Sequence, residues 1–118
     1  MLIVDDDKLF RQGLASVLTA KGFKTIEADD GETGLKQATE QAVDMVVTDV
    51  RMPKMDGLKM LDALRQDERG KKLPAIVFSV DEQPESVNKA LAAGVTVYLS
   101  KVNFDVEVVA GQIVEALR

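Results

Sequence analysis

Five polar side chains stand where they could do chemistry, each at the end of a short apolar run or just after one: Asp5, Asp6, Asp49, Ser79 and Lys101. Carboxylates bind hard cations, a serine hydroxyl can donate a hydrogen bond to a phosphate oxygen, and a lysine ammonium is a compact positive charge. Phosphoryl transfer needs mainly such positioning and charge neutralisation. Any one of these residues alone is more often a helix cap or a solvated charge, so the prediction rests on their joint placement.

The acidic residues of this set predict a metal site. Three ionised carboxylates within a few ångströms of one another are electrostatically unfavourable, and a divalent cation removes that conflict. All the donors are oxygen atoms, which Mg²⁺ prefers, and two carboxylates with one backbone carbonyl are a usual protein share of its ligands. Mn²⁺ could substitute for it. With the charge neutralised, one of the carboxylates could act as a nucleophile toward phosphorus.

An alternation of apolar runs and helical stripes supplies the elements that would place these side chains. Apolar runs predict strands over residues 2–4, 24–28, 45–49, 75–79 and 95–99, and stripes predict helices over about 7–20, 35–42, 58–64, 87–93 and 106–117. Strands that are apolar on both faces indicate an α/β fold, with a parallel sheet covered by helices on both sides. Parallel strands end at one edge of the sheet, so the polar residues that follow them should meet there.

The composition limits the class of protein. A chain of 118 residues with 46% hydrophobic content predicts one domain spanning residues 1–118. Cysteine and histidine are both absent, which excludes thiol nucleophiles, the usual zinc ligands and a histidine base. A net charge of -5 argues against nucleic-acid binding by this domain itself. No apolar run approaches the ~20 residues that cross a bilayer, so we expect a cytoplasmic location and no membrane contact.

The segments that carry these residues resemble a known family. Residues 46–57, which read Val-Val-Thr-Asp-Val-Arg-Met-Pro-Lys-Met-Asp-Gly, closely resemble the phosphoacceptor segment of response-regulator receiver domains of the chemotaxis-regulator type. Residues 4–6 resemble the acidic pair of that family, 77–79 its strand-four hydroxyl, and 98–101 its strand-five aromatic and lysine. The resemblance spans nearly the whole chain. It implies a doubly wound (βα)5 flavodoxin-like sandwich with a five-stranded parallel sheet of order 2-1-3-4-5.

The resemblance also implies a role for each candidate residue. Asp49 would form the aspartyl phosphate and contribute to the metal site. Asp5, Asp6 and the backbone carbonyl of Arg51 would complete the protein ligands of Mg²⁺. These assignments are expectations carried over residue by residue from the family's motifs.

Three further residues are implied to act on the phosphoryl group or to respond to it. Ser79 and Lys101 would contact the phosphoryl oxygens, and Ser79 and Tyr98 would be the switch residues. Their movement would reshape the surface formed by the fourth helix, the fifth strand and the fifth helix.

The implied partners follow from the same resemblance. A histidine kinase or a phosphotransfer protein would donate the phosphoryl group, because a chain without histidine cannot itself hold a phosphohistidine. The switch surface would contact an effector domain or form a homodimer. The domain would promote its own phosphorylation and slow dephosphorylation without being a turnover enzyme.

The sequence departs from the family's pattern at three positions close to the site. Ser79 stands where the family more often has threonine; it keeps the hydroxyl but lacks the methyl that restricts the rotamer. Val102 follows Lys101 where the family usually has proline, often after a cis bond, so we expect a trans bond there, since a non-proline cis bond costs roughly 3 kcal/mol. Val80 follows Ser79 where the family often has alanine or glycine, and its bulk should slow the entry of large phosphodonors.

Three other functions compete with the receiver hypothesis. A flavodoxin-like cofactor binder would need a phosphate-binding loop after the first strand, where this chain has only acidic residues and then Lys8. A phosphatase with an aspartyl-phosphate intermediate would resemble its own family in having a second aspartate two residues after Asp49, where this chain has Arg51. The third alternative is a degenerate receiver that binds a partner without being phosphorylated.

Overall fold

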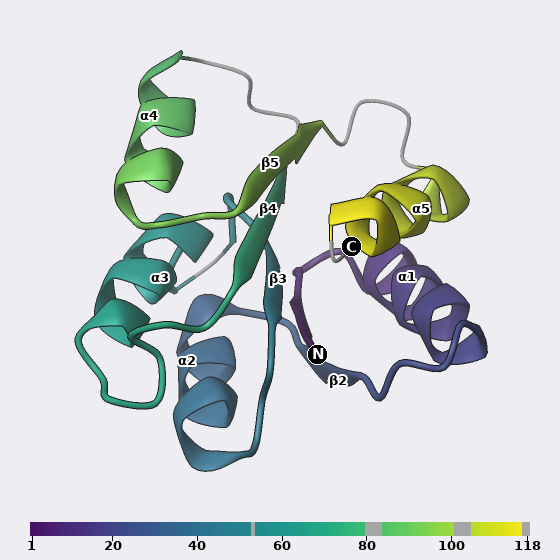
Figure 1. Cartoon of the computed structure of the whole chain (residues 1–118), viewed down its shortest axis with the longest axis horizontal. Coiled ribbons are helices and arrows are strands. Elements are labelled where there is room, and N and C mark those ends of the chain that lie inside the picture. Colours follow the sequence, from purple (N-terminus) through teal and green to yellow (C-terminus); the bar gives the residue numbers. More distant parts are fainter. Residues whose placement is uncertain (53, 80–83, 101–104, 117–118) are drawn as a thin grey trace.

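The computed structural model describes residues 1–52, 54–79, 84–100 and 105–116, which form five strands and five helices in strict alternation (Figure 1). The strands are β1 (Leu2–Val4), β2 (Ile26–Ala28), β3 (Val46–Asp49), β4 (Ala75–Ser79) and β5 (Val97–Ser100). The helices are α1 (Lys8–Ala20), α2 (Gly31–Glu40), α3 (Gly57–Arg65), α4 (Pro84–Ala92) and α5 (Val106–Ala116).

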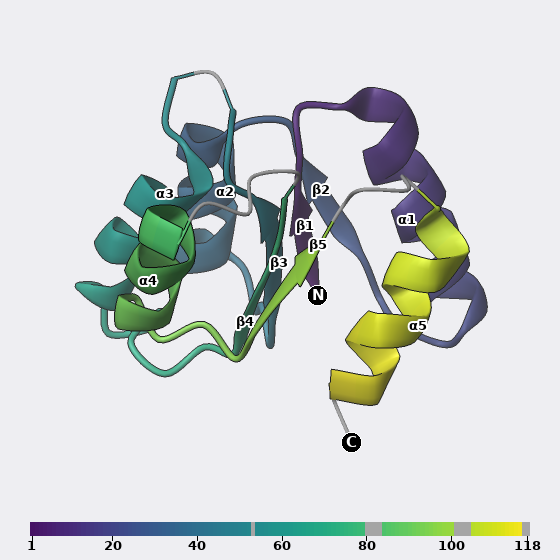
Figure 2. The same cartoon turned by 90° about the horizontal axis from the view of Figure 1, so that it is seen from above.

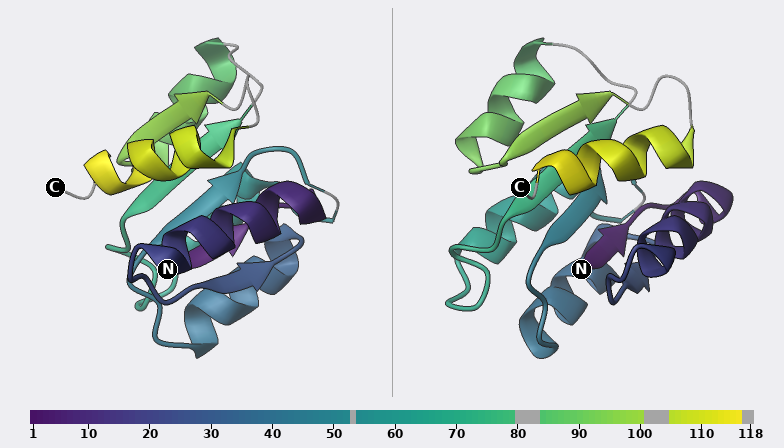
Figure 3. Two further views of the ribbon diagram at one scale, coloured as in Figure 1. Left: turned by 90° about the vertical axis from the view of Figure 1, so that its right-hand side faces the viewer. Right: turned by 45° about the vertical axis from the view of Figure 1, so that its right-hand side comes forward.

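The strands form one parallel sheet in the order β2-β1-β3-β4-β5. This confirms the α/β class that the sequence predicted and the order 2-1-3-4-5 that the resemblance to receiver domains implied. The order reverses at β1, whose neighbours on either side are β2 and β3 (Figure 3). In such sheets the carboxyl ends of the strands beside the reversal form the usual ligand-binding crevice.

Helices cover both faces of the sheet, with α2, α3 and α4 on one side and α1 and α5 on the other (Figure 2). Successive residues of a strand face opposite sides, so β1 contributes Leu2 and Val4 to one core cluster and Ile3 to the other. All three side chains are fully buried. The two-faced burial explains why the strands read as continuous apolar runs.

Three strands are shorter than the sequence indicated, and β3 differs only in beginning at Val46 rather than at Met45. β2 begins at Ile26 rather than at residue 24, and β5 begins at Val97 rather than at residue 95. The length of β2 matches that of β1, because Leu2 pairs with Ile26 at the start of the ladder. Val95 is buried but lies in the turn before β5.

Helix α2 begins four residues earlier than expected and ends at Glu40, which leaves Ala42 outside it. Asp30 caps the helix, because its Oδ1 accepts a hydrogen bond of 2.8 Å from the backbone N–H of Thr33. The expected start was late because Gly31 and Gly34 lack the apolar side chains that mark a helical stripe. Both glycines are buried.

Leu91 on α4 is a second departure, because it belongs to the predicted apolar stripe but is 56% exposed. The core positions on this helix are small residues, Ala90 within it and Ala93 just after it.

Among the described residues, no helix combines the length and the apolar character that crossing a membrane requires.

Candidate functional site

The acidic pair follows β1 at the carboxyl edge of the sheet. Asp5 is fully buried, and its backbone N–H continues the pairing with β2 by donating to the carbonyl of Ala28 at 3.1 Å. Its Oδ1 accepts a hydrogen bond of 3.0 Å from the backbone N–H of Asp7. Asp7 in turn caps α1 by accepting from the N–H of Phe10 at 3.1 Å. The turn that holds Asp5 is therefore also the start of the first helix, and Asp6 within it is exposed.

Asp49 is the last residue of β3 and is 8% exposed. The backbone N–H of Val50 donates to its Oδ1 at 2.7 Å, and the hydroxyl of Thr48 donates to its backbone carbonyl at 2.8 Å. Gly57, at the start of α3, lies so close that a Cβ there would collide with the Asp49 carbonyl oxygen. Glycine at this position therefore lets α3 approach the strand end directly.

The parallel register between β1 and β3 brings these segments together. Val4 lies opposite Thr48, which places the residues that follow them, Asp5 and Asp49, at the same level of the sheet. One carboxylate oxygen from each of Asp5, Asp6 and Asp49 lies within 4.8 Å of the others. The predicted convergence of the three carboxylates is confirmed.

This donor set fits a magnesium ion. Its members are hard oxygen ligands, and two oxygens bound to one ion at ~2.1 Å would lie ~3 Å apart when adjacent and ~4.2 Å apart when opposite, separations that fall within the 4.8 Å limit of the cluster. Two of the three carboxylates are buried and one is exposed, which leaves a side from which solvent can reach the cluster. Nothing in the donor set favours a soft metal.

Two other predicted site residues, Ser79 and Tyr98, lie on β4 and β5. Ser79 ends β4 and is fully buried, one residue beyond Phe78, which lies opposite Asp49. Tyr98 is half-buried in β5 opposite Val77 and packs against the core cluster on the side of α2, α3 and α4.

Arg51 is exposed two residues after Asp49, and its role as a carbonyl ligand stays a prediction. Lys101 lies outside the described residues. The predictions for Val80 and for a trans bond at Val102 also fall on residues outside them.

The loop between β3 and α3 rests against the turn before α2, a support that the sequence did not reveal. Lys54, in the left-handed region with φ of 67°, places its Nζ 3.6 Å from Oδ2 of Asp30. The backbone hydrogen bond from Thr33, followed by Lys54, holds the pKa of Asp30 below its usual value. The Asp-Gly pair at residues 30 and 31 signalled a turn in the sequence, but not its contact with this loop.

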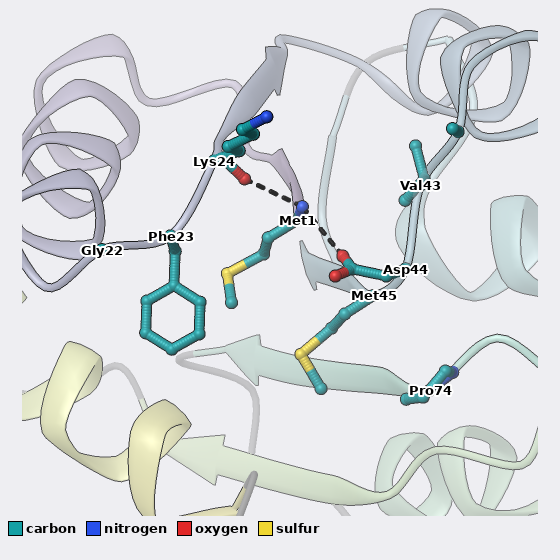
Figure 4. A pocket seen from close by; sticks show the side chains of 9 residues that line it. Met1, Gly22, Phe23, Lys24, Val43, Asp44, Met45 and Pro74 are labelled. Atoms are coloured by element: carbon teal, nitrogen blue, oxygen red, sulfur yellow. Dashed lines mark hydrogen bonds and ion pairs between the residues drawn. The ribbon is translucent and has the colours of Figure 1, made fainter.

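A hollow of about 560 Å³ lies at the opposite edge of the sheet, where the strands begin (Figure 4). It contains the residues immediately before β1, β3 and β4, namely Met1, Met45 and Pro74. Phe23, Ala42 and Val43 add to its apolar lining. Asp5, Asp6 and Asp49 are not among the residues that line it.

Known proteins share both the sequence pattern and the fold. Residues 1–112 match the response regulator receiver domain. The chemotaxis protein CheY of Pseudomonas aeruginosa is 39% identical over 102 residues, which are 86% of this chain and 82% of that protein. The solved structure of the chemotaxis response regulator CheY4 of Vibrio cholerae has a TM-score of 0.88 at 29% identity and covers 98% of this chain and 95% of that chain.

A further solved structure contains an ion. The receiver domain of a sensor histidine kinase from Pseudomonas aeruginosa PAO1, with magnesium coordinated in its active site cleft, has a TM-score of 0.77 at 26% identity. It covers 85% of this chain and 82% of that chain. The match over most of the sequence and the shared sheet topology confirm the resemblance. This chain belongs to the response regulator receiver domains, the signalling modules of two-component phosphorelays.

Proposed function

We propose that Asp49 accepts a phosphoryl group from a phosphohistidine protein, with Mg²⁺ held by Asp5, Asp6, Asp49 and the backbone carbonyl of Arg51. The observation that carries this proposal is the cluster of three carboxylates, with oxygens within 4.8 Å, at the point where the strand order reverses. The magnesium ion in the related receiver domain of the histidine kinase supports the choice of metal.

Asp49 is suited to be the nucleophile because of how its carboxylate is held. Oδ1 accepts the hydrogen bond from Val50, which orients the carboxylate for attack on phosphorus. The new oxygen–phosphorus bond forms as the phosphorus–nitrogen bond of the donor breaks, and the electron pair of that bond stays on the donor imidazole. When bound, Mg²⁺ supplies the positive charge that offsets the carboxylates and the phosphate oxygens.

Ser79 and Lys101 would stabilise the transferred group. Ser79 ends β4, which is paired with β3, so its hydroxyl can donate to a phosphoryl oxygen after a small movement. Lys101 would add a compact positive charge. Both groups act by positioning and charge, the two contributions on which phosphoryl transfer depends.

The switch would run from Ser79 to Tyr98 across adjacent strands. In the β4–β5 ladder Ser79 lies opposite Ser100, two residues from Tyr98. A shift of Ser79 toward the phosphate would favour an inward position of the half-buried tyrosine, as a population shift between two packings. Leu91 on α4 and Val108 on α5, 56% and 51% exposed, are apolar residues on helices that flank this strand.

The partners follow from these surfaces. Receiver domains interact with histidine kinases or phosphotransfer proteins, and such a protein is the proposed donor here. The surface formed by α4, β5 and α5 would contact an effector domain or a second copy of the chain. Arg51 stands where a phosphatase of the aspartyl-phosphate type would have its acid-base aspartate, so the phosphorylated domain would hydrolyse slowly and serve as a signal.

The test is the intact mass of the protein after incubation with acetyl phosphate. We expect a gain of one phosphoryl group that requires Mg²⁺ and is lost in Asp49→Asn. Asp62→Asn, which changes an exposed aspartate on α3, is the matched control and should retain the gain. If the wild type gains no mass, and Val80→Ala also gains none, the degenerate receiver that binds partners without phosphorylation becomes the better hypothesis.

A further inference from the structure

Arg11, on α1, connects the acidic cluster to the edge strand β2 through its guanidinium group. Its Nη1 donates a hydrogen bond of 2.8 Å to the backbone carbonyl of Asp5, and its Nε donates one of 3.0 Å to Oε1 of Glu27. The side chain of Arg11 is 12% exposed and that of Glu27 is 37% exposed. The planar guanidinium carries its donors in a fixed arrangement, so it can hold both acceptors in one geometry.

Asp5 receives hydrogen-bonding support at three of its atoms. Its N–H donates to Ala28, its Oδ1 accepts from Asp7, and its carbonyl oxygen accepts from Arg11. The first two bonds fix the strand end and the side chain within the turn. The hydrogen bond from Arg11 to the Asp5 carbonyl fixes the peptide plane that follows Asp5, and the direction of the carboxylate depends on that plane.

We propose that Arg11 is a positioning residue for the metal site, and that Glu27 holds Arg11 in place. This inference rests on the proposed binding of Mg²⁺ by Asp5, Asp6 and Asp49. Arg11 acts through Asp5 and does not touch the metal. Groups that orient metal ligands from outside commonly change metal affinity by 10- to 100-fold when they are removed, and Arg11 is such a group for Asp5.

The sign of the effect separates positioning from charge. Arg11 is a cation bonded to a metal ligand, so removing its charge would by Coulomb's law alone strengthen the binding of Mg²⁺. Loss of the hydrogen bond to the Asp5 carbonyl would weaken it. A lower affinity in a variant without the guanidinium is therefore a result that electrostatics alone does not give.

The experiment measures the Mg²⁺ dissociation constant by titration calorimetry and the free energy of unfolding in urea on the same samples. We expect a rise in the dissociation constant of about 10-fold or more for Arg11→Met and a smaller rise for Glu27→Ala. The double variant should bind Mg²⁺ no more weakly than Arg11→Met alone, because Glu27 acts only through Arg11.

Arg69→Met is the matched control. Arg69 likewise donates one hydrogen bond to a backbone carbonyl, that of Thr39 at 2.7 Å, but on the exposed surface near the end of α2. It should lose stability without any change in Mg²⁺ affinity. Unchanged or tighter Mg²⁺ binding in folded Arg11→Met would overturn the inference about Arg11. If the wild type still binds Mg²⁺ in that case, the proposed metal site is unaffected.

Two further outcomes are also decisive. If Arg11→Met does not fold, Glu27→Ala decides, since Glu27 is partly exposed and its removal frees Arg11 without deleting it. Unchanged Mg²⁺ affinity in Glu27→Ala would then overturn the inference. If the wild type binds no Mg²⁺, the proposed metal site fails and the inference with it.

Discussion

Arg65, the last residue of α3, holds three segments of the chain together through four hydrogen bonds to backbone carbonyls. Its Nη1 donates to Gly70 at 2.9 Å and to Leu73 at 2.6 Å, both in the connection from α3 to β4. Its Nε donates to Ala93 at 2.9 Å and its Nη2 to Gly94 at 3.1 Å, both at the end of α4. Burial lowers the pKa of this guanidinium. The side chain thus ties the start of the β4 region and the end of α4 to α3.

Replacing Arg65 by methionine keeps an unbranched apolar stem but removes all of these donors. A hydrogen bond from a charged donor contributes about 1.5 to 3 kcal/mol, and a carbonyl that regains water recovers much of that. Gly94 is exposed and Gly70 is buried, so only part of the loss is recovered. We therefore expect Arg65→Met to lower the free energy of unfolding by about 3 to 4 kcal/mol, a large share of the 5 to 15 kcal/mol typical of a domain.

Urea unfolding followed by circular dichroism measures this difference. Arg69→Met serves as the control, because Arg69 donates one hydrogen bond to the Thr39 carbonyl and is exposed. It should cost no more than about 1 kcal/mol. Arg65→Lys should recover only part of the loss, because one ammonium cannot reproduce the planar set of donors. An equal loss of stability in Arg65→Met and Arg69→Met would show that the four hydrogen bonds of Arg65 do not stabilise the fold.

Three other perturbations test separate parts of the structure. Gly57→Ala should destabilise the domain by about 2 kcal/mol or more and slow phosphorylation, because its Cβ would collide with the Asp49 carbonyl; normal stability and phosphorylation would contradict this. In EDTA, the free energy of unfolding of Asp49→Asn, measured in urea, should exceed that of the wild type by about 1 kcal/mol, since the substitution removes one of three clustered charges. Saturating Mg²⁺ should abolish or reverse this difference. The pKa of Asp30 is lowered in the folded state, so the stabilisation by its carboxylate is present above the unfolded value of 3.8 and is lost as the pH falls below it. The difference in free energy of unfolding between the wild type and Asp30→Asn should therefore narrow on acidification. A difference that stays constant with pH would contradict the hydrogen bond from Thr33.

The convergence of Asp5, Asp6 and Asp49 was predictable because it depends only on topology. Each follows or ends an apolar run, and in a parallel sheet those ends share one edge. The order of the strands came from the resemblance to receiver domains, since apolar periodicity does not say which strands are neighbours. The register of β1 against β3 then determines how closely Asp5 and Asp49 approach.

The supports of the site were not predictable in the same way. Arg11 and Arg65 reach backbone carbonyls over six residues and up to 29 residues along the chain, and a long cationic side chain reads in sequence as an ordinary solvated charge. The early start of α2 was missed because Gly31 has low helix propensity and no side chain to pack. Its lack of a Cβ is what allows close contact with the carbonyl of Met55.

Locating the phosphoryl group in the wild-type chain tests directly whether Asp49 is the phosphoacceptor. After incubation with acetyl phosphate and Mg²⁺, borohydride reduces an aspartyl phosphate to homoserine, and peptide mass spectrometry then identifies the modified residue. We expect homoserine at Asp49 and at no other aspartate, and none when EDTA replaces Mg²⁺. Modification at Asp5 or Asp6 instead, or at Asp49 without a divalent ion, would contradict the assignment of Asp49 as the metal-dependent phosphoacceptor.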